Sequence, residues 1–254
     1  MGIVALVLAA GKSSRMGRDK LSMRLHAVWD KSESKSKTNT NTRSLADHTS
    51  CSPVSDVANM NNPTVGGRVL STLLQVSELS SIVIVHSPQS SRAWKAQCRQ
   101  LQQLHHERME LVVCKDAELG MSYSIRCGVQ YVRENSQAQA MMIVLADQPL
   151  LEPAHVQQLV AHMLTHPELH YVAAAGQDGA APPIVFAASI WDRLEQLSGD
   201  QGARRLLQDT SLHGEYVQLP EYCFWDADTP VALERIQQYI TEMSKRVIEH
   251  ERKH

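Results

Sequence analysis

The chain has 254 residues, of which 43% are hydrophobic and 20% charged, and its formal net charge is −2. This length and composition are typical of one α/β domain with a substantial core, and a second full domain is not expected. The near-neutral charge excludes a protein that binds nucleic acid or an acidic membrane through a general positive field.

Cysteine usage and the start of the chain indicate the cellular compartment. The five cysteines occur singly, without the CxxC pair that zinc and redox sites use. The chain passes from Met1 into an apolar stretch without a basic leader, and no apolar run approaches the ~20 residues that span a bilayer. We therefore expect a cytoplasmic protein with reduced thiols.

The first stretch combines a strand, a turn of small residues and several cations. Ile3 to Leu8 is apolar without alternation, as in a strand that is buried on both faces of a parallel sheet. The small residues at 9–11 let the backbone approach a ligand, and the N–H groups of the turn can point at anionic oxygens. The cations that follow are Lys12, Arg15, Arg18 and Lys20. This pattern favours a triphosphate-binding loop; an exposed basic turn is the alternative.

Two common phosphate-binding loops are excluded by their spacing. The first glycine of a P-loop would fall at Leu6, inside the strand. The second glycine of the dinucleotide-binding fingerprint would fall at Ser13.

The stretch from Lys31 to Thr64 differs in composition from the rest of the chain. Half of its 34 residues are Ser, Thr or Asn, and large apolar side chains are sparse. Such a segment buries too little surface to offset the entropy of ordering it. We predict a disordered insertion at 31–64, either a tolerated loop or a lid over the first loop.

The remaining chain alternates predicted helices and strands. Helices are expected at 65–77, 90–104, 120–133 and 153–164, and strands at 81–85, 111–114, 141–145 and 170–175. This order predicts a parallel sheet with crossover helices on both faces. The prolines of a further strand at 182–186 suit only an edge strand or a strand start. We expect a turn and short helix at 199–209, which Asp200 could cap, extended pieces at 217–220 and 223–225, and a terminal helix capped by Thr229.

Three polar stretches follow strands of this predicted sheet. They are the loop at 9–20, the helix start at Gly120 to Ser124 and the segment Ala146 to Pro149. Ligands bind beyond the carboxyl ends of parallel strands, so we expect these stretches to meet, with the helix N-terminus binding an anion or a base edge. Asp147 lies too far before the next helix to cap it, which favours a metal ligand.

Five motifs in order resemble one family. They are LAAGKSSRMGRDK at 8–20, GMSYSIRCGV at 120–129, LADQP at 145–149, GDQGARRLL at 199–207 and DADTP at 226–230. The pattern is similar to that of the MobA-like nucleotidyltransferases, and in particular to the molybdenum cofactor cytidylyltransferases. The resemblance implies a single nucleotidyltransferase domain over 1–254, with a Rossmann-like, mostly parallel sheet of the nucleotide-diphospho-sugar transferase type.

The resemblance also implies a reaction. The terminal phosphate of molybdopterin attacks the α-phosphorus of CTP, which yields the cytosine dinucleotide cofactor and pyrophosphate. Lys12 and Arg15 would hold the β- and γ-phosphates, and Lys20 would lie by the α-phosphate. Asp147, with Asp226 or Asp228, would hold Mg²⁺. An apo-molybdoenzyme of the xanthine dehydrogenase type is the implied partner.

The candidate site residues fall into three groups. The expected catalytic residues are Arg15, Lys20 and Asp147. The expected nucleotide-binding residues are Leu8, Ala9, Ala10, Gly11, Lys12, Ser13, Arg15, Lys20, Gly120, Met121, Ser122 and Asp147. The expected metal ligands are Asp147, Asp228 and Asp226.

A few positions bear on specificity. Ala10 favours CTP, because the guanylyltransferase branch of the family has a second glycine there. Tyr123 replaces a residue that is usually small in the family, and 179–183 lacks the Gly-His-Pro arrangement that the family has on the pterin side. The alternatives are a guanylyltransferase, a sugar- or polyol-phosphate nucleotidyltransferase, and a non-catalytic cofactor-delivery chaperone.

Overall fold

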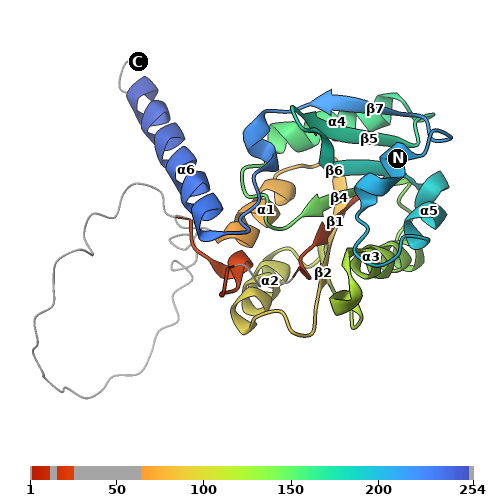
Figure 1. Ribbon diagram of the computed structural model, residues 1–254, viewed down its shortest axis with the longest axis horizontal. Helices are drawn as coiled ribbons and strands as arrows, with labels where there is room; N and C mark the ends of the chain where they lie inside the picture. The colour runs from red at the N-terminus through yellow and green to blue at the C-terminus, as the bar shows by residue number, and fades with distance from the viewer. Residues whose placement is uncertain (1, 12–15, 26–63, 252–254) are drawn as a thin grey trace, which may run out of the picture.

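The fold is a seven-stranded sheet between two layers of helices (Figure 1). The computed structural model describes residues 2–11, 16–25 and 64–251, so the predicted insertion lies outside it except for Thr64. The strands are β1 (Ile3–Leu8), β2 (Leu79–His86), β3 (Met109–Val113), β4 (Ala140–Leu145), β5 (Tyr171–Gly176), β6 (Gly179–Ala187) and β7 (Gly214–Gln218). The α-helices are α1 (Val65–Leu74), α2 (Arg92–Leu104), α3 (Met121–Asn135), α4 (Pro153–Thr165), α5 (Trp191–Glu195) and α6 (Pro230–Glu251).

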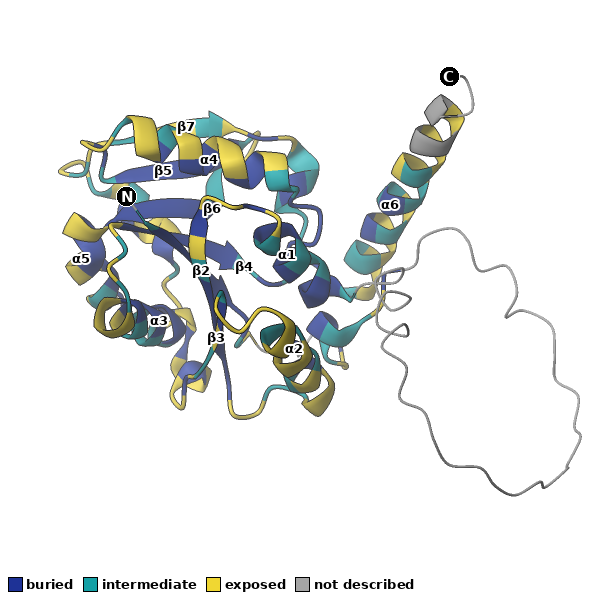
Figure 2. Cartoon of the chain, turned by 180° about the vertical axis from the view of Figure 1, so that it is seen from behind, coloured by how far each residue is buried: buried dark blue, intermediate teal, exposed yellow. Residues whose placement is uncertain are grey.

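The strand order β3-β2-β1-β4-β6-β5-β7 places β1 near the centre of the sheet. All six residues of β1 are buried, and the strand pairs in parallel with both β2 and β4. Its unbroken apolar run therefore reflects burial on both faces, as the sequence predicted. Figure 2 shows buried strands inside and exposed residues on the outer sides of the helices.

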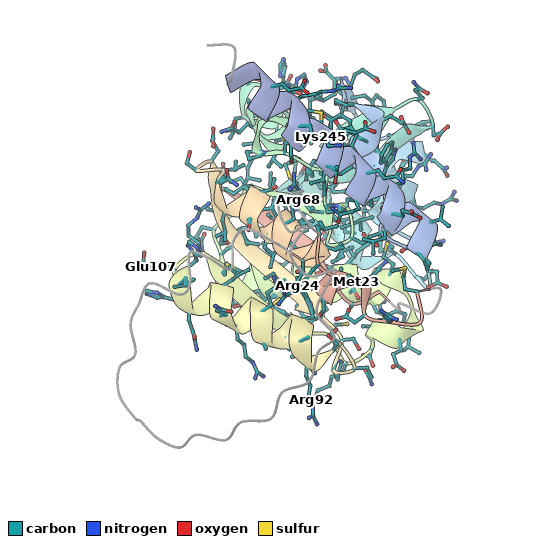
Figure 3. The ribbon with its side chains drawn as sticks, turned by 90° about the vertical axis from the view of Figure 1, so that its left-hand side faces the viewer. Met23, Arg24, Arg68, Arg92, Glu107 and Lys245 are labelled. Carbon is teal, nitrogen blue, oxygen red and sulfur yellow. The ribbon has the colours of Figure 1, made fainter. Side chains whose placement is uncertain are left out.

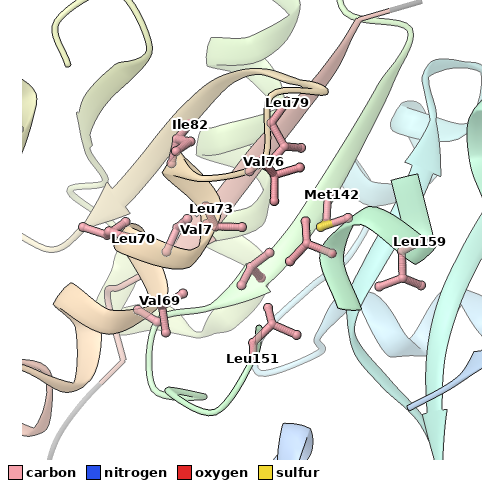
Figure 4. Packing of buried hydrophobic residues seen from close by; sticks show 14 of the residues in the cluster. Val7, Val69, Leu70, Leu73, Val76, Leu79, Ile82, Met142, Leu151 and Leu159 are labelled. Carbon is pink, nitrogen blue, oxygen red and sulfur yellow. The ribbon is translucent and has the colours of Figure 1, made fainter. Parts of the chain in front are cut away.

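Alternate residues of β1 belong to two separate apolar cores. Ile3, Ala5 and Val7 face a core shared with α1, α2, α4 and α6, while Val4, Leu6 and Leu8 face one shared with α3 and α5. Figure 4 shows part of the first core, in which Val7 and Met142 of the sheet belong to one buried cluster with Val69 and Leu73 of α1. The predicted mostly parallel sheet with helices on both faces is confirmed.

The prolines of the strand at 182–186 were expected at an edge or at a strand start, and the first of these is wrong. β6 lies between β4 and β5 and runs antiparallel to both. The ladder avoids the prolines, because pairing with β4 stops at Ile184 and the register with β5 jumps from Ile184 to Ala181. Pro182 and Pro183 thus fall at an irregularity, where their missing N–H groups break no ladder hydrogen bond.

Two local predictions near the C-terminus also differ from the structure. The piece at 223–225 was expected to be extended, but Glu221–Phe224 forms a 3₁₀ helix, η6. The short helix η5 (Ala203–Gln208) has Gly202 as its N-cap and no side-chain cap, so Asp200 does not cap it. The expected cap of the terminal helix is confirmed, because the Ala232 N–H donates to Thr229 Oγ1 at 3.1 Å. Among the described residues, no helix is long and apolar enough to cross a membrane.

Candidate active site

The backbone after β1 lies at the carboxyl edge of the sheet. The Ala9 N–H donates to the Val85 carbonyl at 2.9 Å, and Leu8 accepts from the Ala146 N–H at 3.2 Å. These bonds tie the first loop to β2 and to the segment after β4. Ala10 is half-buried, and Gly11 is exposed with open space where a Cβ would lie. The predicted residues Lys12, Ser13 and Arg15 lie outside the described part of the chain.

The short 3₁₀ helix η1 (Lys20–Ser22) carries a buried cation into the site. The Lys20 ammonium donates to Asp147 Oδ2 and to Asp228 Oδ1, although these aspartates are 127 and 208 residues away in sequence. The Lys20 side chain is 9% exposed, and those of Asp147 and Asp228 are 17% and 28% exposed. Figure 1 shows η1 beside the start of α6.

The charge of Lys20 is stabilised by this pair of carboxylates. Burial disfavours the charged ammonium, but attraction and hydrogen bonds from Asp147 and Asp228 outweigh that cost and raise its pKa. Lys20 is therefore a permanently charged group at neutral pH. A cation of this kind can neutralise charge that develops on a phosphoryl group.

The segment that carries Asp147 is held by three hydrogen bonds from two neighbouring elements. The Asp147 carbonyl accepts from the Ala227 N–H at 2.9 Å, which joins it to the loop before α6. On α1, Arg68 Nε donates to the Pro149 carbonyl at 2.8 Å and Thr72 Oγ1 to the Leu151 carbonyl at 2.9 Å. Figure 3 shows the side of the molecule on which Arg68 lies, with α1 between α2 and α6 in this view.

Asp226 differs from its neighbour Asp228. Burial, together with the nearby charge of Asp147, raises the pKa of Asp226 to about 6, against the opposing effect of a hydrogen bond from Gln148. The Asp226 Oδ1 and Gln148 Oε1 atoms are buried without a hydrogen-bond partner. The Lys20 ammonium donates to Asp147 and Asp228, and its positive charge also acts to lower the pKa of Asp226.

The oxygen-rich donor set at this edge fits a hard divalent cation. Carboxylates of two loops converge here, and the partnerless Asp226 and Gln148 oxygens add acceptors. In the part of the chain that the structure describes, no three His, Cys, Asp or Glu side chains already form a metal-binding group. The Lys20 ammonium lies between Asp147 and Asp228, so a divalent cation at this place would compete with the ammonium for the same carboxylates.

The start of α3 is built against the turn at 199–202. Gly120 has φ 132°, and a Cβ there would lie 2.2 Å from the Gly199 carbonyl oxygen, so only glycine fits. The Ser122 N–H and Oγ both donate to that same oxygen, at 3.2 and 2.7 Å. Ser122 is fully buried and joins two sequence motifs, whereas Met121 is 41% exposed at the helix start. Tyr123 contacts Arg126, whose guanidinium lies 4.3 Å from the ring centre.

Sequence reasoning missed several residues that shape this site. Gln148 and Asp19 stand inside the quoted motifs, directly beside Asp147 and Lys20, and that adjacency was the available signal. The sequence around Arg68 gave no indication of its role, because its hydrogen-bond acceptor is the Pro149 carbonyl in a distant loop.

One family model decides the classification. Residues 57–216 match the MobA-like NTP transferase domain. The chain belongs to the MobA-like NTP transferase family. It is therefore a nucleotidyltransferase, and the resemblance seen in its motifs is confirmed. The matched region contains the motifs at 120–129, 145–149 and 199–207, while those at 8–20 and 226–230 lie outside it.

Known proteins extend the comparison to most of the chain. The purine catabolism protein PucB of Bacillus subtilis is 31% identical over 211 residues, which cover 83% of this chain and 82% of PucB. Rv0371c of Mycobacterium tuberculosis has a TM-score of 0.64 at 20% identity, over 94% and 99% of the two chains. A complex of Rv0371c with manganese has a TM-score of 0.59 at 17% identity, over 94% and 99%.

A third relative carries a functional name. Molybdopterin-guanine dinucleotide biosynthesis protein A of Archaeoglobus fulgidus has a TM-score of 0.55 at 15% identity, over 93% of this chain and 97% of that protein. These structures share the nucleotide-diphospho-sugar transferase fold with this chain.

The raised pKa of Asp226 predicts how stability depends on pH in the metal-free protein. A carboxyl with a raised folded pKa stabilises the fold when protonated, and this contribution is lost as pH rises through about 6. Asp226→Asn cannot ionise, so we expect it to be about 1 kcal/mol more stable than the wild type at pH 7.5, with the difference vanishing near pH 4. Urea unfolding in EDTA at both pH values measures this. An Asp226→Asn variant that is less stable than the wild type at pH 7.5 would contradict the prediction.

Proposed function

We propose that this nucleotidyltransferase transfers CMP from CTP to the terminal phosphate of molybdenum-molybdopterin, giving the cytosine dinucleotide cofactor and pyrophosphate. The observation that carries the proposal is the convergence of Lys20, Asp147 and Asp228 at the carboxyl edge of the sheet. Nucleotide-type ligands bind at this edge in open α/β folds. One domain over 1–254 would contain the whole site.

The proposed reaction forms one P–O bond and breaks another. An oxygen of the acceptor phosphate attacks the α-phosphorus of CTP, and the bond from that phosphorus to the α–β bridging oxygen breaks, so pyrophosphate leaves. Lys20 would lie by the α-phosphate, where it neutralises charge that builds on the oxygens. Lys12 and Arg15 would hold the β- and γ-phosphates, with Leu8, Ala9, Ala10, Gly11 and Ser13 contributing the loop backbone. Gly120 and Met121 would line the base side, where Met121 is exposed, while the buried Ser122 would fix the turn that positions them.

Asp147 and Asp228 are the proposed Mg²⁺ ligands. When bound, the metal supplies positive charge to the phosphate oxygens. The Asp147 and Asp228 side chains are 17% and 28% exposed, whereas Asp226 accepts a hydrogen bond from Gln148 and its Oδ1 atom is buried. We therefore assign Asp226 to supporting the two ligands.

The acceptor would enter from the β6 side of this edge. β6 runs antiparallel to β4, so its first residues lie at the same edge as Asp147. There Arg204 Nη2 donates to the Asp178 carbonyl at 3.5 Å, and its guanidinium is exposed. Arg204 is a suitable group for an acceptor phosphate, and it compensates for the absent Gly-His-Pro arrangement at 179–183.

Ala10 supports CTP as the donor. Incubation with molybdenum cofactor, Mg²⁺ and either CTP or GTP, followed by mass analysis of the pterin product, tests this choice. We expect turnover with CTP to exceed that with GTP about tenfold or more, because a pocket that hydrogen-bonds one base leaves polar groups unpaired with another. Ala10→Gly should reduce the ratio of CTP turnover to GTP turnover.

Other outcomes of the same experiment identify the alternatives. Equal or greater turnover with GTP would contradict the cytidylyl assignment and favour the guanylyl reaction; the Archaeoglobus relative is named for molybdopterin-guanine dinucleotide biosynthesis. CTP binding without pyrophosphate release would favour a delivery chaperone for a molybdoenzyme of the xanthine dehydrogenase type. Pyrophosphate release only with sugar or polyol phosphates would exclude the pterin.

A further inference from the structure

We infer that Asp19 is a positioning residue, which fixes Lys20 between Asp147 and Asp228 by anchoring η1 to the start of α2. This inference rests on the proposed function, because it concerns how the catalytic cation is held. Three observations carry it: the hydrogen bonds of the Asp19 carboxylate, the rigidity of the helix that they reach, and the distance over which Lys20 must be directed.

The Asp19 carboxylate is engaged by three donors. It accepts from the Leu21 N–H at 3.3 Å as the N-cap of η1, and from the hydroxyls of Ser22 and Ser91. The two serine Oγ atoms are themselves 3.2 Å apart. Two of these donors belong to η1 and the third to α2, so one half-buried carboxylate joins both elements.

The helix at the other end of this link is firmly packed. Ser91 is the N-cap of α2, and its Oγ accepts from the Trp94 N–H at 3.1 Å. Trp94 is 1% exposed and lies against Gly66 of α1, where a Cβ would approach the indole to 2.4 Å. Because no other residue than glycine fits there without a shift, α1 and α2 meet closely and the position of Ser91 is well defined.

The link acts on the backbone of Lys20 from the residue directly before it. Lysine has a long side chain with much rotamer freedom, which must be lost when its ammonium is held at one point. Two carboxylates hold the far end of Lys20, and Asp19 holds the near end through η1. With its near end released, the ammonium would visit positions away from Asp147 and Asp228, and the geometry needed for transfer would be populated less often.

Lysine acylation provides a test that does not depend on activity. Acetic anhydride modifies exposed neutral amines, and mass spectrometry of the Lys20 peptide gives the rate at that side chain, with exposed Lys115 as the internal reference. We expect Asp19→Ala to raise Lys20 labelling about fivefold or more relative to Lys115, because local opening exposes the ammonium. Asp19→Asn, which keeps an acceptor oxygen and the shape, should restore at least half of the protection.

Asp209→Asn is the matched control. Asp209 also accepts from a backbone N–H and a serine hydroxyl of its own turn, those of Ser211, but this turn has no link to Lys20. Lys20 labelling should not change in this variant. If Asp19→Ala does not fold, Ser22→Ala removes one donor and should still raise labelling measurably. Unchanged labelling in every folded Asp19 or Ser22 variant would overturn the inference.

The kinetic test uses Lys20→Met as a second background. Asp19→Ala should lower kcat about tenfold and change KM for CTP less, since misplacing a catalytic group acts mainly on the chemical step. In the Lys20→Met background the same substitution should cause no further loss beyond about twofold. An equal loss in both backgrounds would show that Asp19 does not act through Lys20. A Lys20→Met variant with normal kcat would instead contradict the proposed function, while the labelling result would still decide the role of Asp19.

Discussion

Asp147→Asn is expected to lower the rate of pyrophosphate release about 100-fold or more, by analogy with the loss of one preorganised electrostatic contact. The substitution keeps the shape of the side chain and removes its charge. The main-chain bond from Ala227 to the Asp147 carbonyl and the hold of Arg68 on Pro149 do not involve the carboxylate, so the loop should keep its position. The loss should therefore appear in turnover much more than in the free energy of unfolding.

Neighbouring aspartates supply the controls for this experiment. Asp228→Asn should show a loss of similar size, while Asp226→Asn should show a smaller one, because we propose that Asp226 supports the two ligands and does not bind the metal itself. Asp192, an exposed partner of Arg133 far from the site, is a matched control, and Asp192→Asn should leave turnover unchanged. Near-normal turnover in Asp147→Asn would reject it as a ligand, and a larger loss in Asp226→Asn than in Asp228→Asn would reverse the assignment of the two.

Lys20→Met is expected to lower kcat about 100-fold and, at the same time, to strengthen metal binding in the absence of nucleotide. The rate should fall because the substitution removes the cation that we propose to lie by the α-phosphate. Metal binding strengthens because Asp147 and Asp228 lose the ammonium that neutralises them. Mn²⁺ titration followed by electron paramagnetic resonance should show binding about tenfold tighter than in the wild type, which corresponds to about 1.4 kcal/mol.

Thermal unfolding gives a second measurement on the same variant. Without metal, removing one partner of a largely buried ionic cluster leaves uncompensated carboxylates and should cost about 3 kcal/mol or less, given their partial exposure. Mn²⁺ should restore more of the melting temperature in Lys20→Met than it adds to the wild type. Lys20→Arg is the control that keeps the positive charge and changes the shape of the side chain. Its planar guanidinium should not restore kcat. Weaker Mn²⁺ binding in Lys20→Met would show that ammonium and metal do not compete for these carboxylates.

Much of the fold follows from local patterns in the sequence. The unbroken apolar run of β1 predicted burial on both faces, and the alternation of helical and strand periods predicted parallel pairing with crossover helices. Both predictions are confirmed, because burial of a strand and the length of a connection can each be recognised from a short stretch of sequence. The place of β6 was not predictable in this way. Prolines indicate an edge strand only where they would interrupt the hydrogen bonds between strands. The register jump beside Ile184 leaves Pro182 and Pro183 outside the regular pairing with β5, so they do not require an edge position.

The sequence by itself determined the family, the sheet and the identity of the acidic and basic groups, because motifs of adjacent residues carry that information. Only the tertiary structure decided which of those groups meet. Lys20 contacts Asp147 and Asp228, which are 127 and 208 residues away in sequence. Ser122 was expected to contact the nucleotide, but its hydroxyl donates to the Gly199 carbonyl and so joins α3 to the turn at 199–202. Asp19 likewise gains its role only when α2 brings Ser91 alongside it. Such contacts depend on how strands and helices pack in space, which the local spacing of residues along the chain does not predict.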